Sequence, residues 1–404
     1  MYITEHERKV AVGGEYDVIV AGGGIAGVSA ALAAARQSKN VLLLEKMFML
    51  GGLATAGLVT IYLPICDGKG KQVSFGIAEE LLRLSVKYGY EPDMNGTTKE
   101  GNPRGMAWLT GDEDGKGKHR FEVQFNANVF AILCEQLLLE SGVKILYGTS
   151  VCAVTVENKK ITSVITENKS GRIAYKGKSF VDASGDADLC HLSGAKTENF
   201  KQGNILASWY YEMIDSEYRL KMLGFADIPD KYKKAEDKSK KRYTGLDGDE
   251  ISQMVCESHE NLLNNFLKKG NINKEHALTN IASIPQLRMT RRIVGKYTLN
   301  DEEMFKSFSD SIGMISDWRK AGPVYEIPFG CLYGKDIKNL ITCGRCISVT
   351  DDMWDISRVI PACAVTGEAA GIAAAISDDF ATLDYNKLAY SLKNSGVKLH
   401  TDEI

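Results

Sequence analysis

Three glycines near the start of the chain have the spacing needed to hold a diphosphate. Gly22, Gly24 and Gly27 form the pattern G-x-G-x-x-G between a run of β-branched residues and a run of small residues. The first glycine permits a tight turn, the second lets a diphosphate approach the backbone, and the third lets helix and strand pack closely. Because free N–H groups at the start of a helix attract anions, this turn predicts a dinucleotide site.

The elements around the turn support this interpretation. Residues 16–21 favour a buried strand, and Ile25–Arg36 favours a helix whose alanines allow close packing on a sheet. A second apolar strand begins at Val41 and ends at Glu45, about twenty residues after the turn, where a carboxylate can accept hydrogen bonds from a ribose. Strand, turn, helix and acid therefore have the order of a Rossmann-like unit.

The same stretch could instead be a membrane span, because about 18 residues pass without a charge. Consecutive glycines would interrupt such a helix, and the small residues differ from the large apolar ones of a spanning helix. Acidic residues before the stretch also argue against a signal peptide. The nine cysteines are odd in number and scattered, which favours a reducing compartment. We therefore expect no membrane span and a cytoplasmic protein.

Composition limits the choice of partners. The 404 residues are enough for two domains, and a net charge of −3 gives no reason to expect nucleic acid. A basic run between Asp230 and Glu250 is more typical of a solvated surface, so we expect no nucleic-acid partner. The sequence also contains no cluster typical of a metal site, and we expect no metal. His119 and His191 are open candidates for an acid or base.

Three further stretches narrow the choice of dinucleotide. They are MLGGLATAGLV at residues 49–59, FVDASGDADLC at residues 180–190, and NLITCGRC at residues 339–346 with a later helix opened by Pro361. With the glycine turn, they resemble the FAD-dependent oxidoreductases of the glutathione reductase type 2 superfamily over nearly the whole chain. The resemblance is weak only between about residues 198 and 280.

The resemblance implies an α/β fold with two parts. One is a Rossmann-like FAD-binding domain, in which a parallel sheet carries a β-meander crossover, made from residues 1–60, 121–195 and 325–404. The other is an inserted α+β substrate or lid domain, made from residues 61–120 and 196–324. We expect noncovalently bound FAD and a small-molecule substrate.

Residue by residue, the resemblance implies contacts along the whole cofactor. The glycine turn would contact the diphosphate, Glu45 would bind the ribose, and the double glycine would lie beside the flavin. Gly344 and Arg345 occupy a late strand end where many relatives have Gly-Asp. The implied FAD-binding residues are Gly22, Gly24, Ile25, Ala26, Gly27, Glu45, Lys46, Gly51, Gly52, Leu53, Ala54, Thr55, Val151, Ala183, Ser184, Gly185, Gly344, Arg345, Pro361, Ala362 and Cys363.

The helix opened by Pro361 has its own physical reason to face the flavin. Proline suits the first turn of a helix, and the N–H groups of Ala362, Cys363 and Ala364 would then be unpaired. The positive end of the helix dipole would stabilise negative charge on a reduced flavin. The alternative is a helix that only packs in the core, and both can hold.

Arginines in the expected lid are candidates for binding substrate. Arg288 and Arg291 lie just before a strand expected to begin at Ile293, and planar guanidinium groups clamp carboxylates or phosphates. Ion pairs between domains are an equally good reading. Cys343 and Cys346 form C-x-x-C, which is either a redox dithiol or core packing.

These observations predict an FAD-dependent dehydrogenase or reductase that acts on a small organic substrate. If this substrate is anionic, Arg288 and Arg291 could bind it. The sequence has one dinucleotide fingerprint, so a separate nicotinamide domain is not expected. The alternatives are an NAD(P)-dependent dehydrogenase and a flavoprotein subunit that passes electrons within a larger complex. The sequence does not define the substrate, the direction of electron flow, the electron partner or the oligomeric state.

Overall fold

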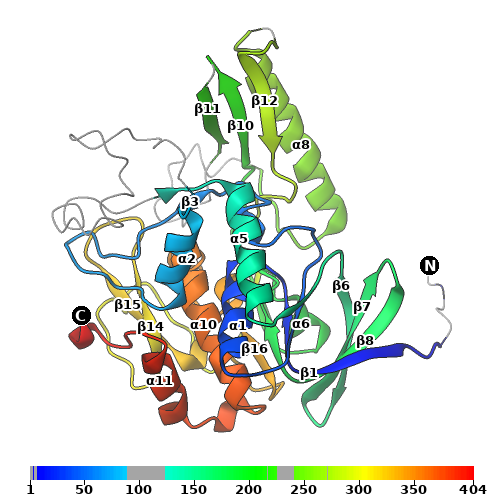
Figure 1. The fold of residues 1–404 in the computed structure, drawn as a ribbon, viewed down its shortest axis with the longest axis vertical. Coiled ribbons are helices and arrows are strands. Elements are labelled where there is room, and N and C mark those ends of the chain that lie inside the picture. Colours follow the sequence, from blue (N-terminus) through cyan, green and yellow to red (C-terminus); the bar gives the residue numbers. More distant parts are fainter. Residues whose placement is uncertain (1–2, 4–6, 89–122, 216, 225–240, 271) are drawn as a thin grey trace.

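A seven-stranded sheet forms the centre of the structure (Figure 1). The structure is a computed structural model that describes residues 3, 7–88, 123–215, 217–224, 241–270 and 272–404. Its strand order is β5-β2-β1-β8-β7-β6, and β16 also pairs with β8. The strands are β1 (Ala11–Ala21), β2 (Val41–Leu44), β5 (Lys144–Leu146), β6 (Ser150–Glu157), β7 (Lys160–Asn168), β8 (Gly171–Asp182) and β16 (Leu340–Thr342).

The sheet combines a parallel part with an antiparallel meander. Strands β5, β2, β1, β8 and β16 pair in parallel, whereas β6, β7 and β8 pair antiparallel. Strand β1 starts five residues before the expected 16–21, because Ala11 already pairs with Ile173 of β8. Val18, Ile19 and Val20 are fully buried, as expected for a parallel strand covered on both faces. The predicted parallel sheet with a β-meander is confirmed.

Two helices rich in small residues pack tightly together in the core. They are α1 (Ile25–Arg36), whose bounds agree with the prediction, and α10 (Ile360–Ile376). A Cβ on Gly367 of α10 would lie 2.3 Å from the carbonyl oxygen of Ala26, so only glycine allows this approach. Helices α2 (Ile77–Ser85) and α5 (Ala127–Glu140) share the same hydrophobic core. Figure 1 shows α1 and α10 side by side next to the sheet.

A smaller antiparallel sheet projects from the main body at the top of Figure 1. It has the order β11-β10-β12 and is covered by the long helix α8 (Gly248–Leu267). The strands are β10 (Ser208–Ile214), β11 (Glu217–Leu223) and β12 (His276–Ile281). This sheet and α8 lie within the expected lid, whereas α2 lies in the main core. The domain boundaries themselves stay a prediction.

Short elements complete the described chain. Strands pair as β3 with β4, β9 with β13, and β14 with β15. Their bounds, with those of the remaining helices, are β3 (Ile61–Tyr62), β4 (Val123–Gln124), β9 (Thr197–Asn199), β13 (Arg291–Ile293), β14 (Ser311–Ser316), β15 (Val324–Pro328), α6 (Asp188–Leu192), α9 (Asp351–Ser357) and α11 (Tyr385–Asn394).

The sequence predicts no membrane-spanning helix. In the described ranges, no single helix has the length and apolar character to cross a membrane. Helices α9 and α10 meet that criterion only as a pair bent by 92°.

Candidate active site

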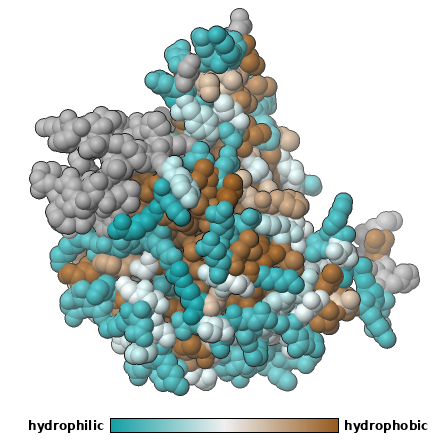
Figure 2. Space-filling model, in the orientation of Figure 1, coloured by the Kyte–Doolittle hydropathy of each residue, from teal (hydrophilic) through white to brown (hydrophobic). Residues whose placement is uncertain are grey.

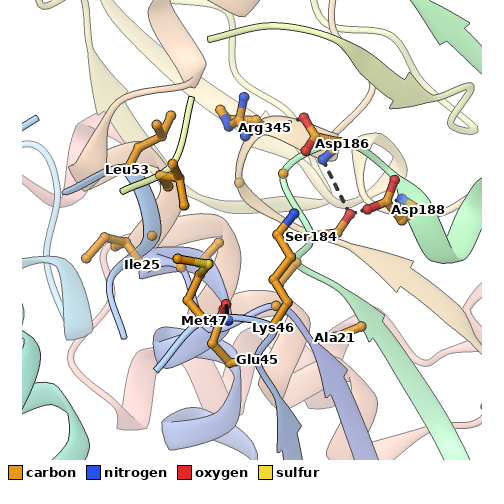
Figure 3. Close-up of a pocket in the computed structure, with 18 of the residues that line it drawn as sticks. Ala21, Ile25, Glu45, Lys46, Met47, Leu53, Ser184, Asp186, Asp188 and Arg345 are labelled. Atoms are coloured by element: carbon orange, nitrogen blue, oxygen red, sulfur yellow. Dashed lines mark hydrogen bonds and ion pairs between the residues drawn. The ribbon is translucent and has the colours of Figure 1, made fainter. Parts of the chain in front are cut away.

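A cavity of about 580 Å³ opens at the carboxyl ends of the parallel strands (Figure 3). Ala21, Leu44, Ala183 and Cys343 line it, and each stands at or just after the end of β1, β2, β8 or β16. Ligands of open α/β sheets bind at this edge. The sheet therefore gathers residues that are far apart in the sequence around one cavity.

The three glycines of the turn have different surroundings. A Cβ on Gly22, where φ is 102°, would lie 2.5 Å from the carbonyl oxygen of Ala183. A Cβ on Gly27 would lie 1.8 Å from the carbonyl oxygen of Gly22, whereas a Cβ on Gly24 would meet no described atom within 4 Å. Gly22 and Gly24 line the cavity and Gly27 does not. Gly27 thus permits packing, while Gly24 leaves space for a ligand at the start of α1.

Glu45 connects the end of β2 to the glycine turn. Its side chain is 6% exposed, and it accepts hydrogen bonds from the backbone nitrogens of Gly23 (2.6 Å) and Met47 (2.7 Å). Glu45 and the exposed Lys46 both line the cavity. Figure 3 shows Glu45 at one end, Arg345 at the other, and Lys46 between them. A carboxylate has further acceptor positions beyond these two bonds, so a ribose can still bind it.

The double-glycine loop is fixed against the same turn. The backbone nitrogen of Gly51 donates to the carbonyl oxygen of Gly23 (2.8 Å), and Gly51 has a positive φ of 97°. A 3₁₀ turn, η1 (Gly52–Ala54), follows. Gly51, Gly52, Leu53 and Ala54 line the cavity, but Thr55 is 1% exposed and its hydroxyl donates to the carbonyl of Leu50. Thr55 therefore supports the loop from behind.

The segment after β8 forms a third wall. Ala183, Ser184 and Gly185 of this segment line the cavity together with Val151 of β6, as the resemblance implies. The buried carboxylate of Asp182 accepts hydrogen bonds from the Ser184 hydroxyl (2.7 Å) and the Cys190 nitrogen (2.9 Å), which fixes this wall.

Two carboxylates on this wall, Asp186 and Asp188, also line the cavity. Partial burial of Asp188, with the negative charges of Asp186 and Asp182, raises its pKa to about 6. Its oxygen accepts from Arg291 at 2.9 Å, and Arg291 also donates to the carbonyl oxygen of Asp186. Arg291 is therefore engaged with the wall and is not part of the cavity lining. This geometry favours the ion-pair reading of Arg291.

Arg345 joins the sheet edge to the expected lid. Gly344 begins a 3₁₀ turn, η4 (Gly344–Cys346), and both Gly344 and Arg345 line the cavity. The Arg345 guanidinium donates to the carbonyl oxygens of Leu287 (3.0 Å) and Arg288 (2.9 Å), and lies 3.5 Å from Asp186. Arg345 thus holds the segment before β13 over this end of the cavity.

The start of α10 differs from the expectation. The helix begins at Ile360, and the Cys363 nitrogen already donates to the carbonyl oxygen of Val359 (2.9 Å). The prediction of an unpaired N–H at Cys363 is therefore wrong, because the helix starts one residue before Pro361. Cys363 lines the cavity, whereas Pro361 and Ala362 are buried and are not in its lining.

The strand expected to begin at Ile293 is also placed differently. Strand β13 ends at Ile293 after three residues, since its partner β9 is equally short. Beyond it, Lys296 and Tyr297 donate to carbonyl oxygens of Tyr333 and Gly330. Arg288, which precedes β13, is 4% exposed and is not in the cavity lining.

The thiols and histidines have no evident reactive role. Cys343 and Cys346 are buried free thiols, and burial with the charge of Asp182 raises their pKa well above the usual value. This favours core packing, because the thiolate is the reactive form. His191 is exposed on α6 and outside the cavity lining. His119 lies outside the described residues.

Other lining residues were not anticipated from the sequence. Six of them stand in or next to the quoted stretches, so position offered a signal for them. They are Asp186, Asp188 and Leu189 at residues 180–190, Cys343 at residues 339–346, and Arg358 and Ile360 just before Pro361. Residues of the lid segment offered none, because the resemblance did not mark them. The unanticipated lining residues are Ala21, Leu44, Met47, Thr149, Ser150, Asp186, Asp188, Leu189, Ser283, Ile284, Pro285, Leu287, Cys343, Arg358 and Ile360.

A known protein family matches most of the chain. Residues 17–207 and 202–392 match a family described as FAD dependent oxidoreductase. A thioredoxin reductase from Ureaplasma parvum serovar 3 is 37% identical over 76 residues, which are 19% of this chain and 25% of that protein. The chain thus matches about a quarter of that relative's length.

Two solved structures are similar over most of the chain. A geranylgeranyl bacteriochlorophyll reductase-like protein from Thermoplasma acidophilum has a TM-score of 0.45 at 14% identity, covering 95% of this chain and 83% of that one. A triple mutant of the flavin-dependent brominase Bmp2 has a TM-score of 0.47 at 13% identity, covering 94% and 84%.

Proposed function

Because the chain belongs to the FAD-dependent oxidoreductase family, we propose that it is a dehydrogenase or reductase of a small organic molecule, with FAD held in the cavity at the sheet edge. The fold is a Rossmann-like FAD-binding fold and the cofactor is FAD. The NAD(P)-dependent alternative is not favoured by the family match. The observation that carries the proposal is one cavity that joins the glycine turn to residues of the expected lid.

The residues of the cavity fit the cofactor. The absent side chain of Gly24 leaves open space at the start of α1, where a diphosphate would meet backbone N–H groups. Glu45 would hold the ribose, and Lys46 adds a positive charge on the same side of the cavity. Gly51, Gly52 and Leu53, together with the start of α10, would then lie along the flavin half.

FAD would supply the ring that accepts or donates a hydride or electrons. The protein would orient the substrate and exclude water over that ring. Ile284, Pro285 and Leu287 give the lid side of the cavity an apolar wall, and Arg345 holds this segment in place through two backbone carbonyls. A small organic substrate would bind between this wall and the start of α10.

The cellular setting is part of the proposal. All nine cysteines are free thiols, which supports a reducing compartment such as the cytoplasm. The net charge of −3 supports a small-molecule substrate over nucleic acid.

Spectroscopy tests the proposal directly. The purified protein should show the visible absorption of bound flavin, and heat denaturation should release FAD into the supernatant, because no covalent link is expected. Anaerobic addition of dithionite should bleach the band. A protein that purifies without flavin and takes up none from solution would contradict the proposal, and so would flavin that stays with the precipitate.

A further inference from the structure

Arg288 is a buried cation whose guanidinium has no hydrogen-bond or ion-pair partner in the described part of the chain. It is 4% exposed, and its Nε and Nη2 are buried and make no hydrogen bond to any described residue. Burial and the positive charges of Arg358 and Arg345 lower its pKa to about 9, so it is still charged at neutral pH. Leaving a buried charge unpaired costs free energy unless a ligand completes the site.

Neighbouring residues fix the backbone of Arg288 and the aromatic ring beside its side chain. Its backbone nitrogen donates to Asn204 at 3.1 Å, and its carbonyl oxygen accepts from Arg345 at 2.9 Å. Its guanidinium carbon lies 5.0 Å from the ring centroid of Trp209. Trp209 is itself fixed by bonds from its backbone nitrogen to Gln286 and from its indole nitrogen to Gly224. The backbone and one face of Arg288 thus have fixed neighbours, whereas its Nε and Nη2 have no hydrogen-bond partner among the described residues.

The charges at this end of the cavity leave one positive charge unbalanced. Arg345 pairs with Asp186 at 3.5 Å, and Arg358 pairs with Asp355 at 2.5 Å, while Arg288 has no carboxylate among the described residues. A single anionic charge would therefore complete the group. A carboxylate carries one negative charge and matches the planar guanidinium, whereas a phosphate dianion would exceed the balance.

Arg358 offers a second donor on the cavity side. It lines the cavity, and its Nε and Nη2 both donate to Asp355. Its Nη1 makes no hydrogen bond within the described ranges. Leu287, the neighbour of Arg288, also lines the cavity. Arg288 itself is outside the lining, but it is near enough for the charges of Arg358 and Arg345 to act on it. An anion bound by Arg358 would therefore be attracted to the unpaired Arg288 guanidinium next to this end of the cavity.

We propose that Arg288 and Arg358 bind the carboxylate of the substrate, which is therefore an organic monocarboxylate oxidised or reduced elsewhere on its carbon skeleton. This inference rests on the proposed function, since it places the substrate at the lid end of the FAD cavity. The Trp209 ring lies beside the Arg288 guanidinium, 5.0 Å from its central carbon to the ring centroid, and would limit its movement. Arg291 and Arg292 are not part of the site, because they pair with Asp188 and Glu198.

The test uses the flavin-loaded protein and simple anions. Acetate, benzoate, inorganic phosphate and the neutral analogue benzamide are titrated at about pH 8, where phosphate is mainly a dianion. The visible flavin band and the melting temperature are followed. Acetate and benzoate should shift the band and raise the melting temperature, and phosphate and benzamide should not. Arg288→Lys should weaken benzoate binding about tenfold or more, because loss of one bond to a charged group exceeds the tenfold equivalent.

A matched control separates binding from structure. Arg292→Lys changes an arginine that is equally buried, at 5% exposure, but paired with Glu198. It should leave benzoate affinity unchanged. Arg288→Met should remove anion binding and keep or raise the melting temperature without ligand, since it removes an unpaired buried charge. A purely structural arginine would instead lower it.

The outcomes distinguish this inference from the proposed function. Absence of FAD would overturn both. Bound FAD with no response to carboxylates, a response to phosphate alone, or equal weakening by Arg292→Lys would overturn the carboxylate site and leave the oxidoreductase assignment standing. A fall in the melting temperature of ligand-free Arg288→Met, or benzoate binding retained by this variant, would also overturn it.

Discussion

At the scale of single residues, a side chain added at Gly24 should affect FAD binding, whereas one added at Gly27 should affect the stability of the fold. Gly24 has φ −66° and ψ 178°, which any residue adopts, and a Cβ there meets no described atom within 4 Å. Gly24→Val should therefore fold normally but lose FAD, because its side chain takes the space of the diphosphate. Gly27→Ala would place a methyl carbon 1.8 Å from the carbonyl oxygen of Gly22 and should destabilise the fold.

FAD content after purification and the melting temperature check this pair. Gly24→Val should purify colourless, with the melting temperature of wild-type protein from which FAD has been removed. Gly27→Ala should melt at a lower temperature than that reference. Full FAD occupancy in Gly24→Val would show that the ligand space lies elsewhere.

Residues that act locally could be predicted from the sequence, and residues placed by tertiary contacts could not. Gly22, Gly24 and Glu45 stand in one strand-turn-helix unit, so their spacing indicates their positions in the structure. Arg358 and Leu287 reach the cavity only because the link between α9 and α10 and the segment held by Arg345 converge there. Arg288 was predicted as a substrate-binding candidate because it is an arginine. Only the structure shows that its guanidinium has no hydrogen-bond or ion-pair partner among the described residues.

At the scale of elements, Glu368 connects α10 to the start of α2. Its Oε2 accepts from the backbone nitrogen of Ile77 at 2.8 Å, and the side chain is 2% exposed. Burial raises its pKa from 4.5 to about 8. The folded protein thus retains this proton up to about pH 8, while the unfolded chain releases it near pH 4.5. This group therefore lowers the free energy of unfolding progressively as pH rises from about 4.5 to 8.

Glu368→Gln should remove this part of the pH dependence, because glutamine keeps an acceptor oxygen for Ile77 and does not ionise. One pKa unit corresponds to about 1.4 kcal/mol, so the difference is measurable. Urea unfolding at several pH values should show the variant gaining stability relative to wild type between pH 5 and pH 8. Parallel profiles for the two proteins would contradict the assignment.

Elements were predicted well where local preference and tertiary packing favour the same structure. Helix α1 has the predicted bounds, since its small residues both favour a helix and allow packing on α10. Strand β13 was predicted to begin where it ends, because the alternation after Ile293 reflects contacts of Lys296 and Tyr297 with another turn. A single sequence cannot show which partner an alternating segment will find.

At the scale of the whole molecule, the described surface shows apolar areas of no assigned role. Figure 2 shows apolar surface on the face that carries α5, where Ile132 and Leu139 are more than half exposed. Such residues are common on protein surfaces and do not define a partner. The cavity is different, because residues from the amino-terminal, central and carboxyl-terminal parts of the chain all line it. Any ligand that fills it must connect these parts.

FAD should therefore stabilise the molecule as a whole. A ligand that binds only the folded state adds about 2.7 kcal/mol at a concentration 100 times its dissociation constant. Protein freed of FAD should melt at a lower temperature than the loaded protein, and added FAD should restore the loss in a concentration-dependent way. Gly24→Val should not respond, because its fold is intact and its ligand space is closed. If FAD raised the melting temperature of Gly24→Val as much as that of wild type, the flavin would be binding somewhere other than the cavity that the glycine turn, Glu45 and Arg345 enclose.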